Sequence, residues 1–170
     1  DSPLMADGLM DVQDRSEKEL VSSILLNIKT MLREAKIKLP TNTEAEISHH
    51  FGLEYFREFG AVLITVVNKE YCKKLVIQLP RQKHPYHYHK TKSETFQVLF
   101  GDLSLEVDGH PHKLLEGEIF TVDPGMWHKF DTLEGVIFEE ISTKSIIGDS
   151  FYEDEKITKN SARKTHVKLF

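Results

Sequence analysis

From Ala61 onward the chain is a succession of short runs rich in β-branched and aromatic residues. Turn-forming pairs such as Gly101-Asp102, Asp108-Gly109 and Pro124-Gly125 separate these runs at short intervals. No helical periodicity intervenes between them. Many short strands at this spacing predict an all-β sandwich or barrel. The expected strands cover residues 61–67, 75–79, 87–89, 95–100, 103–107, 113–115, 119–122, 127–130 and 136–142.

An amphipathic helix is expected before this β-rich region. Ser16 and Glu19 have the spacing of a capping box, and apolar residues then recur at helical spacing up to Ala35. The pattern predicts a helix of about 20 residues that ends before Pro40. Its apolar stripe would pack on its own domain, on a second subunit or on a neighbouring domain. Residues 1–15 are polar and mixed, and we expect them to be poorly ordered.

The segment from residue 41 to 60 carries weaker helical signals. Thr43 and Glu46 could cap a second, shorter helix. His49 and His50 fall within it, and adjacent residues diverge by about 100° on a helix, so they are expected to be surface or cap histidines. The expected organisation is a tail and helical extension over 1–60 and a barrel over 61–142. A flap or tail over 143–170 would belong to the same domain.

The composition excludes several classes of protein. The 170 residues include 22 basic and 27 acidic side chains, a net charge of −5, whereas phosphate binding needs a basic face. We expect no nucleic-acid partner, and the basic cluster from Arg163 to Lys168 is expected to be a solvated tail. Cys72 is the single cysteine, so no disulfide forms within the chain, and it is expected to be a small strand residue. No run approaches the ~18 apolar residues of a membrane span and no secretory signal is visible, which favours a cytoplasmic protein without a membrane partner.

Three histidines and one glutamate are spaced like a metal site built on strands. His87 and His89 are two residues apart, so on a strand both side chains point to the same face. Glu94 follows five residues later, with room for a bend, and His128 would come from a distant strand. Neutral imidazoles and a carboxylate suit one divalent ion of Mn, Fe, Co, Ni or Zn. Four protein ligands leave positions open for substrate oxygens or water.

These residues match the two motifs of the cupin superfamily, which the chain resembles over residues 61–142. The first motif reads G-x5-H-x-H-x4-E-x6-G, with Arg81 in place of its first glycine. The second reads G-x5-P-x-G-x2-H-x3-N, with the proline shifted to Pro124 and Thr132 in place of the asparagine. The resemblance implies a cupin double-stranded β-helix, a jelly-roll barrel, with an N-terminal helical extension. It also implies a homodimer, because proteins of this superfamily commonly form dimers. The matching residues are His87, His89, Glu94 and Gly101 in the first motif and Gly117, Gly125 and His128 in the second.

Strand parity from the expected ligands predicts which side chains line the barrel. Residues two apart on a strand share a face. Alternate residues after Glu94 are therefore expected to point into the barrel with it, and alternate residues after His128 likewise. Val136 and Glu140 would share a face in the late strand. The segment 149–154 is acid-rich and could fold over the cavity. The candidate substrate-binding residues are Phe96, Val98, Phe130, Phe138 and Tyr152.

Two further residues indicate a reaction. Lys92 lies within an H-x-H-x2-K-x-E run that is similar to the one in sugar-isomerising cupins resembling D-lyxose isomerase. The stretch from Val136 to Thr143, which contains Glu140, resembles the late strand of the same group. A lysine and a glutamate on opposite sides of a hydroxy-carbonyl substrate could move protons through an enediol. The alternatives are a solvated lysine and a structural salt bridge for Glu140.

A longer resemblance covers residues 49–170. This stretch, including the segment Gly148–Ile157, is similar to the C-terminal cupin domain of bacterial sialic acid (N-acetylneuraminate) synthase-type proteins. The resemblance implies a role in sialic acid or nonulosonate-type carbohydrate metabolism, with the chain as the cupin portion alone. The condensing barrel of that family has no counterpart here.

Three functions therefore remain open. The favoured one is a metal-dependent sugar isomerase whose partner is a small-molecule sugar. The second is a non-catalytic sugar-binding or assembly module of a sialic acid synthase-type protein. The third, an iron-dependent dioxygenase, is permitted by the ligand set, but nothing in the sequence marks an aromatic or thiol substrate.

Overall fold

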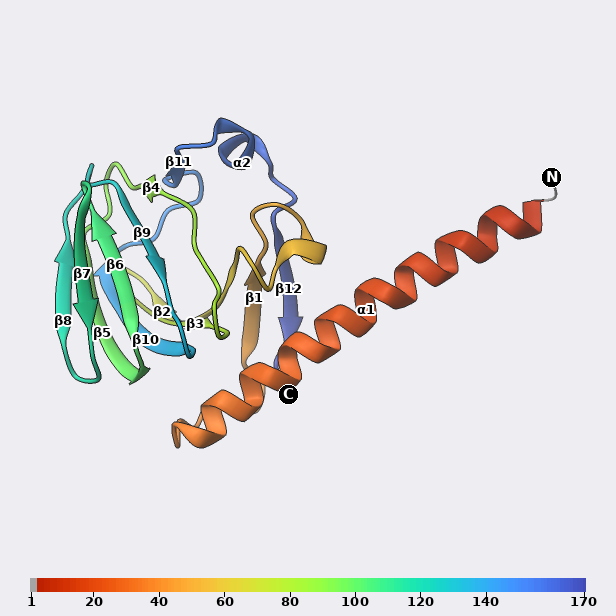
Figure 1. Ribbon diagram of the computed structural model, residues 1–170, viewed down its shortest axis with the longest axis horizontal. Coiled ribbons are helices and arrows are strands. Elements are labelled where there is room, and N and C mark those ends of the chain that lie inside the picture. The colour runs from red at the N-terminus through yellow and green to blue at the C-terminus, as the bar shows by residue number, and fades with distance from the viewer. Residues whose placement is uncertain (1–2) are drawn as a thin grey trace.

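The computed structural model describes the backbone of residues 3–170 and the side chains of residues 16–170. Two antiparallel sheets face each other, and a long helix lies along the outer side of one of them (Figure 1). The helical elements are α1 (Pro3–Glu34), η1 (Leu53–Tyr55) and α2 (Glu155–Lys159). In spatial order, the larger sheet contains β12 (Lys164–Lys168), β1 (Glu44–Ser48), β2 (Ala61–Asn68), β3 (Tyr71–Gln78), β10 (Val136–Thr143), β5 (Glu94–Gly101) and β8 (Ile119–Val122). The smaller sheet contains β11 (Phe151–Tyr152), β4 (His87–Tyr88), β9 (His128–Asp131), β6 (Leu103–Val107) and β7 (His110–Leu114).

The strand predictions for residues 61–142 are confirmed. Each expected run coincides with one of the described strands β2 to β10, with ends that differ by a few residues. Side chains from both sheets meet between them in a buried apolar core. Cys72 is buried in β3, as expected for a small strand residue. This inner core includes Val76, Phe96, Val98, Leu105, Phe130 and Phe138.

A second core lies on the outer face of the larger sheet, where α1 packs. The predicted apolar stripe is confirmed: Ile24, Ile28 and Leu32 are buried against residues of β1, β2 and β3. The predicted helix start is wrong, because α1 begins at Pro3 and Ser16 lies inside it. The N-terminal part of α1 projects beyond the sheets (Figure 1). Residues 1–2 of the segment expected to be poorly ordered lie outside the described residues.

The helix predicted between residues 41 and 60 is wrong. The segment forms strand β1, in which Ala45 and Ile47 are buried while Glu44 and Glu46 are more exposed. This alternation has the period of a strand, and pairing with β2 and β12 satisfies the backbone of β1 on both edges. His49 and His50 follow the strand and are buried, 7 % and 2 % exposed, so the expectation of surface histidines is also wrong.

The C-terminal segment is folded onto the barrel. Strand β11 pairs with β4, and β12 pairs with β1 at the edge of the larger sheet. The expectation of a solvated basic tail is therefore wrong: Arg163 is half-buried, and Lys164 opens β12. Among the described residues, no helix is both long and apolar enough to cross a membrane.

Two turn positions account for the glycine pattern of the first motif. Gly101 has a φ of 83°, and a Cβ added there would lie 2.0 Å from the carbonyl oxygen of Gly135. Only glycine fits this close approach. Arg81 occupies the position of the first motif glycine and adopts a φ of 64°. The turn thus keeps its left-handed backbone although the residue has changed.

Candidate metal centre and cavity

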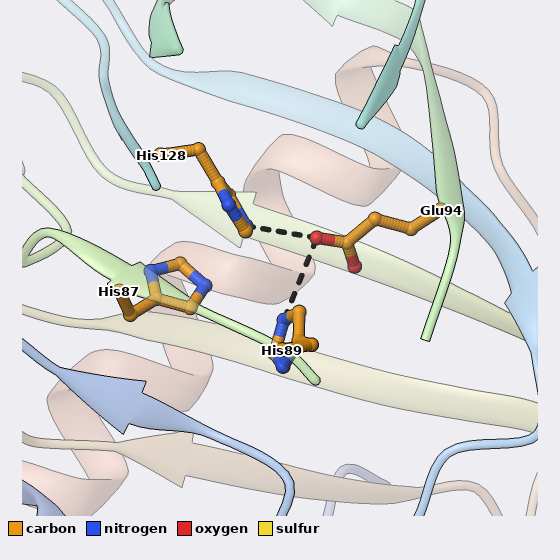
Figure 2. A group of neighbouring side chains, drawn as sticks. All are labelled: His87, His89, Glu94 and His128. Carbon is orange, nitrogen blue, oxygen red and sulfur yellow. Dashed lines mark ion pairs between the residues drawn. The ribbon is translucent and has the colours of Figure 1, made fainter. Parts of the chain in front are cut away.

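The four expected ligands meet in one buried cluster. His87 begins β4, His89 follows that strand, Glu94 begins β5 and His128 begins β9. One ligand atom from each residue can be chosen so that all lie within 4.8 Å of one another. Figure 2 shows the four side chains converging from three segments of the chain, with His87 and His89 on the same one. The cluster joins both sheets, because Glu94 belongs to the larger sheet and the histidines to the smaller one or its edge.

Glu94 lies at the centre of the cluster. Its Oε1 atom is 2.8 Å from Nε2 of His128 and 3.5 Å from Nε2 of His89 (Figure 2). The rings of His87 and His128 lie side by side, with centroids 4.1 Å apart. The two histidines are also directly paired in the β4–β9 ladder. The carboxylate therefore faces imidazole nitrogens within ligand-to-ligand distances.

Backbone carbonyls orient all three histidine rings. In each ring Nδ1 lies within hydrogen-bond distance of a carbonyl oxygen, so Nδ1 carries the proton and donates it. The other nitrogen, Nε2, then presents a lone pair, which is the state that binds a metal. The Nδ1-to-oxygen distances are 3.0 Å from His87 to Pro85, 2.9 Å from His89 to Asp149 and 2.9 Å from His128 to Met126.

The protonation states suit a divalent cation. Burial, followed by the neighbouring His128 and His84, lowers the pKa of His87 well below its usual value, so that ring is neutral. Burial opposes ionisation of Glu94, but the positive charge of Lys92, with the neighbouring histidines, outweighs it and lowers the pKa of Glu94 well below its usual range. Neutral imidazoles and an ionised carboxylate are the ligands that Mn, Fe, Co, Ni and Zn accept.

Unsatisfied polar atoms point to the same conclusion. Oε1 of Glu94 and Nε2 of His128 are buried, and neither has a hydrogen-bond partner among the described residues. With the proton on Nδ1 of His128, two acceptors face each other at 2.8 Å. Such an arrangement is costly unless a cation lies beside both atoms. The donor set therefore fits a bound metal ion.

Lys92 and Glu140 form a buried ion pair next to this cluster. The Nζ atom of Lys92 lies 3.1 Å from Oε2 of Glu94 and 3.3 Å from Oε2 of Glu140. Burial opposes the charge of Lys92, but Glu140 and Glu94 outweigh it and raise its pKa above the usual value. Burial and the nearby Glu94 raise the pKa of Glu140. The two side chains contact each other directly, and their expected placement on opposite sides of a substrate stays a prediction.

A cavity of about 480 Å³ opens beside the cluster. His87, His89, Lys92 and Glu140 contribute to its wall, together with segments from β1, β3 and the C-terminal region. Two of the five expected substrate-binding residues, Phe130 and Tyr152, line it. The other three have the expected facing but lie deeper, where the sheets close on each other. Phe96, Val98 and Phe138 are buried in the inner core and are not part of the cavity lining.

Several residues near the centre were not among the expected site residues. His84 stacks on Phe130 with ring centroids 4.4 Å apart and lies 4.5 Å from the ring of His87. His50 packs edge-on against His84. Asp149 fixes the ring of His89 through its carbonyl and accepts hydrogen bonds from the 90–91 segment through its carboxylate. Asp149 belongs to the acid-rich segment that was expected to fold over the cavity, whereas the sequence indicated no contact for His50 or His84, because their partners are distant in the chain.

The outer part of the cavity wall was also missed. Glu46, Lys74, Arg163 and Lys164 line it. They belong to β1, β3 and the start of β12, which lie side by side with β2 in the larger sheet. Without the pairing of β1 with β12, nothing in the sequence indicates that residues 46 and 164 face the same cavity.

Comparison with known proteins agrees with this geometry. Residues 74–137, which include all four clustered side chains, match the family model described as "Cupin domain". This chain has the cupin fold. The chain also resembles the solved L-ribose isomerase of Geodermatophilus obscurus, with a TM-score of 0.68 and 14 % identity, over 82 % of this chain and 93 % of that one. At that identity the likeness concerns the fold alone.

Two curated proteins are similar to this cupin along most of its length. A D-lyxose ketol-isomerase from Thermofilum sp. (strain ex4484_79) is 29 % identical over 170 residues, covering 82 % of this chain and 94 % of the relative. A D-lyxose/D-mannose isomerase from Thermosediminibacter oceani is 28 % identical over 171 residues, covering 83 % and 94 %. These relatives include no sialic acid synthase-type protein, so they give that expected resemblance no support.

Proposed function

We propose that this cupin is a divalent-metal-dependent aldose–ketose isomerase. The observation that carries the proposal is the buried Lys92–Glu140 pair in the wall of a cavity beside the His/Glu cluster. The names of the two curated relatives support a pentose or hexose such as D-lyxose or D-mannose as the substrate. His87, His89, Glu94 and His128 would hold the metal, one ion of Mn, Fe, Co, Ni or Zn.

The bound metal would polarise the carbonyl and the adjacent hydroxyl of the sugar. Isomerisation of an aldose removes the proton from C2 and delivers a proton to C1, while the proton on the C2 oxygen moves to the C1 oxygen. Glu140 is the proposed base for the carbon proton, because its raised pKa brings a carboxylate closer to the working pH. The protonated carboxyl of Glu140 would exchange its proton with water in the cavity and then deliver a proton to C1, so no oxidant or further reactant is consumed.

Lys92 has a different proposed role. Its raised pKa keeps it an ammonium, which cannot act as a base. It would hold the carboxylate of Glu140 in place and donate a hydrogen bond to a sugar oxygen that gains negative charge. Phe130 and Tyr152 would bind the sugar from the cavity wall. The deeper Phe96, Val98 and Phe138 would support the ligands through packing.

Metal removal and restoration test the proposal. The protein is purified without nickel, stripped with chelator, and reloaded separately with each candidate ion under anaerobic conditions. D-Lyxose and D-mannose should convert to their ketoses only in a reloaded sample. Turnover that requires oxygen would replace the isomerase with the dioxygenase, and sugar binding without turnover by any reloaded sample would favour the non-catalytic module.

A further inference from the structure

Basic side chains gather at the outer end of the cavity. Lys74, Arg163 and Lys164 line it there together with one acidic residue, Glu46, and we refer to these four residues as the cationic rim. The chain as a whole carries a net charge of −5, whereas the four rim residues together are positively charged. A concentration of positive charge inside a cavity raises the local concentration of anionic ligands.

Arg163 is held in place but not satisfied. Its guanidinium carbon lies 5.2 Å from the ring centre of Tyr152, and Nη1 donates to the carbonyl oxygens of Ile157 and Asn160. Its Nε atom is buried and has no hydrogen-bond partner among the described residues. Arginine recognises carboxylates and phosphates through paired N–H groups. Nε is too buried to reach a ligand, so Arg163 would offer an anion the fixed positive charge of its guanidinium in the cavity wall.

The two lysines of the rim are also incompletely neutralised. Nζ of Lys164 lies 3.5 Å from Oε1 of Glu46, whereas Nζ of Lys74 donates to the neutral hydroxyl of Ser145 at 3.1 Å. Burial, only partly offset by Glu46, lowers the pKa of Lys164, and Arg163 and Lys74 lower it further. Lys74 also interacts electrostatically with Glu140, so two carboxylates, Glu46 and Glu140, face the three basic side chains, and an added anion would relieve the remaining repulsion.

The rim lies one side chain away from the proposed reaction centre. The ring of Tyr152 stacks on His87, with centroids 5.4 Å apart, and also contacts the guanidinium of Arg163. In the β3–β10 ladder, Lys74 is directly paired with Glu140. A sugar whose carbonyl end meets His87 and Glu140 would therefore extend its other end toward Arg163 and Lys74.

We propose that the cationic rim binds an anionic group, a phosphate or a carboxylate, at the end of the sugar remote from its carbonyl. The substrate class would then be an aldose phosphate or a uronic acid, and Arg163 and Lys74 would determine the preference. This inference rests on the proposed isomerase, because the isomerase reaction defines which end of the sugar meets the metal.

The experiment compares three sugars on the metal-loaded protein: D-mannose, D-mannose 6-phosphate and D-mannuronate. Turnover and dissociation constants are measured for the wild type, Arg163→Gln, Lys74→Gln and the control Lys168→Gln, an exposed residue of β12 outside the cavity lining. At least one anionic sugar should bind about tenfold or more tightly than mannose, as expected for a charge-assisted pair. Each rim variant should lose that advantage and keep its affinity for mannose within about twofold. Lys168→Gln should behave like the wild type.

The outcomes separate the two proposals. Preference for the phosphate alone or for the uronate alone identifies the anion, and either result supports the rim. In another outcome, anionic sugars bind more tightly than mannose, with the advantage lost in Arg163→Gln, while no sugar is converted. That result would support the cationic rim and overturn the proposed isomerase. If mannose is converted and bound as well as both anionic sugars, the isomerase stands and the rim proposal is overturned. Thermal unfolding of both rim variants identifies a folding defect, and one folded variant suffices for the test.

Discussion

The cavity has two ends that are built in different ways. The metal end draws its four side chains from residues 87–128, and three of them lie within eight positions of one another. The cationic rim draws on residues 46, 74, 163 and 164, which only the pairing of β1 with β12 and of β2 with its neighbours brings together. The reacting group is thus encoded in a local motif, whereas the proposed choice of substrate depends on long-range strand pairing.

The largest effect is expected from removal of a ligand at the metal end. His128→Ala should weaken metal binding by more than about a hundredfold and abolish turnover. Mutation of a residue that only hydrogen-bonds to a metal ligand already lowers metal affinity or activity by about ten- to hundredfold. His112→Ala is the matched control, since His112 lies in β7 outside the cluster. Metal content after gel filtration and isomerase activity are measured together. Full metal occupancy in His128→Ala would contradict the assignment of His128 as a metal ligand.

Glu140→Gln should separate chemistry from metal binding. We expect kcat to fall by about 10²–10⁴, the usual contribution of a general base, while metal content stays unchanged. Glu139→Gln is the control on the adjacent, opposite-facing position, where the side chain pairs with Lys73. Equal activity of Glu140→Gln and wild type would exclude Glu140 as the base. Metal loss in Glu140→Gln would instead make it a structural support of the cluster.

The terminal segments can be tested through the outer core that holds them. Ile28 of α1 is fully buried against the larger sheet, so Ile28→Ala should lower the free energy of unfolding by about 2–5 kcal/mol. Leu26→Ala, at a position 65 % exposed, should change it little. Urea unfolding measures both variants. Normal stability of Ile28→Ala would mean that α1 does not support β1 and the rim beside it.

The smallest expected effect concerns pH and His50. Burial, followed by the nearby Arg163 and His49, lowers the pKa of His50 to about 3. The folded pKa is depressed below the unfolded value of 6.5, so protonation of the unfolded chain removes stability as the pH falls below that value. Between pH 7 and 5 this single group should cost about 2 kcal/mol. His84, in the loop that precedes β4, also faces His50. Burial lowers the pKa of His84 as well.

Urea unfolding of wild type and His50→Gln at pH 7 and pH 5 measures that contribution. The loss of stability on acidification should be smaller in His50→Gln, and His110→Gln, at an exposed position, should match the wild type. An identical loss in all three proteins would show that His50 is protonated in the folded state.

The metal end could be predicted from the sequence, whereas the cationic rim could not. Strand periodicity and turn pairs locate β2 to β10, and the motif spacing identifies the four side chains that meet at the metal end. The segment around Ala45 was misassigned because a capping pattern competes with a short alternation that only its partner strands stabilise. Arg163 looked like part of a tail because composition does not reveal a strand that pairs with residues over a hundred positions away. Face parity indicated the facing of Phe96 and Phe138, but not how closely the sheets pack above them.

Deuterium incorporation tests the central claim most directly. Metal-loaded protein is incubated anaerobically with D-mannose, D-lyxose and their 5- or 6-phosphates in D₂O, and the products are examined by NMR. Proton transfer through Glu140 predicts a ketose with solvent deuterium at C1, formed by the wild type and Glu139→Gln but not by Glu140→Gln. A ketose formed at the wild-type rate without deuterium at C1 would contradict the account, because the hydrogen would then have passed from C2 to C1 without exchange at Glu140.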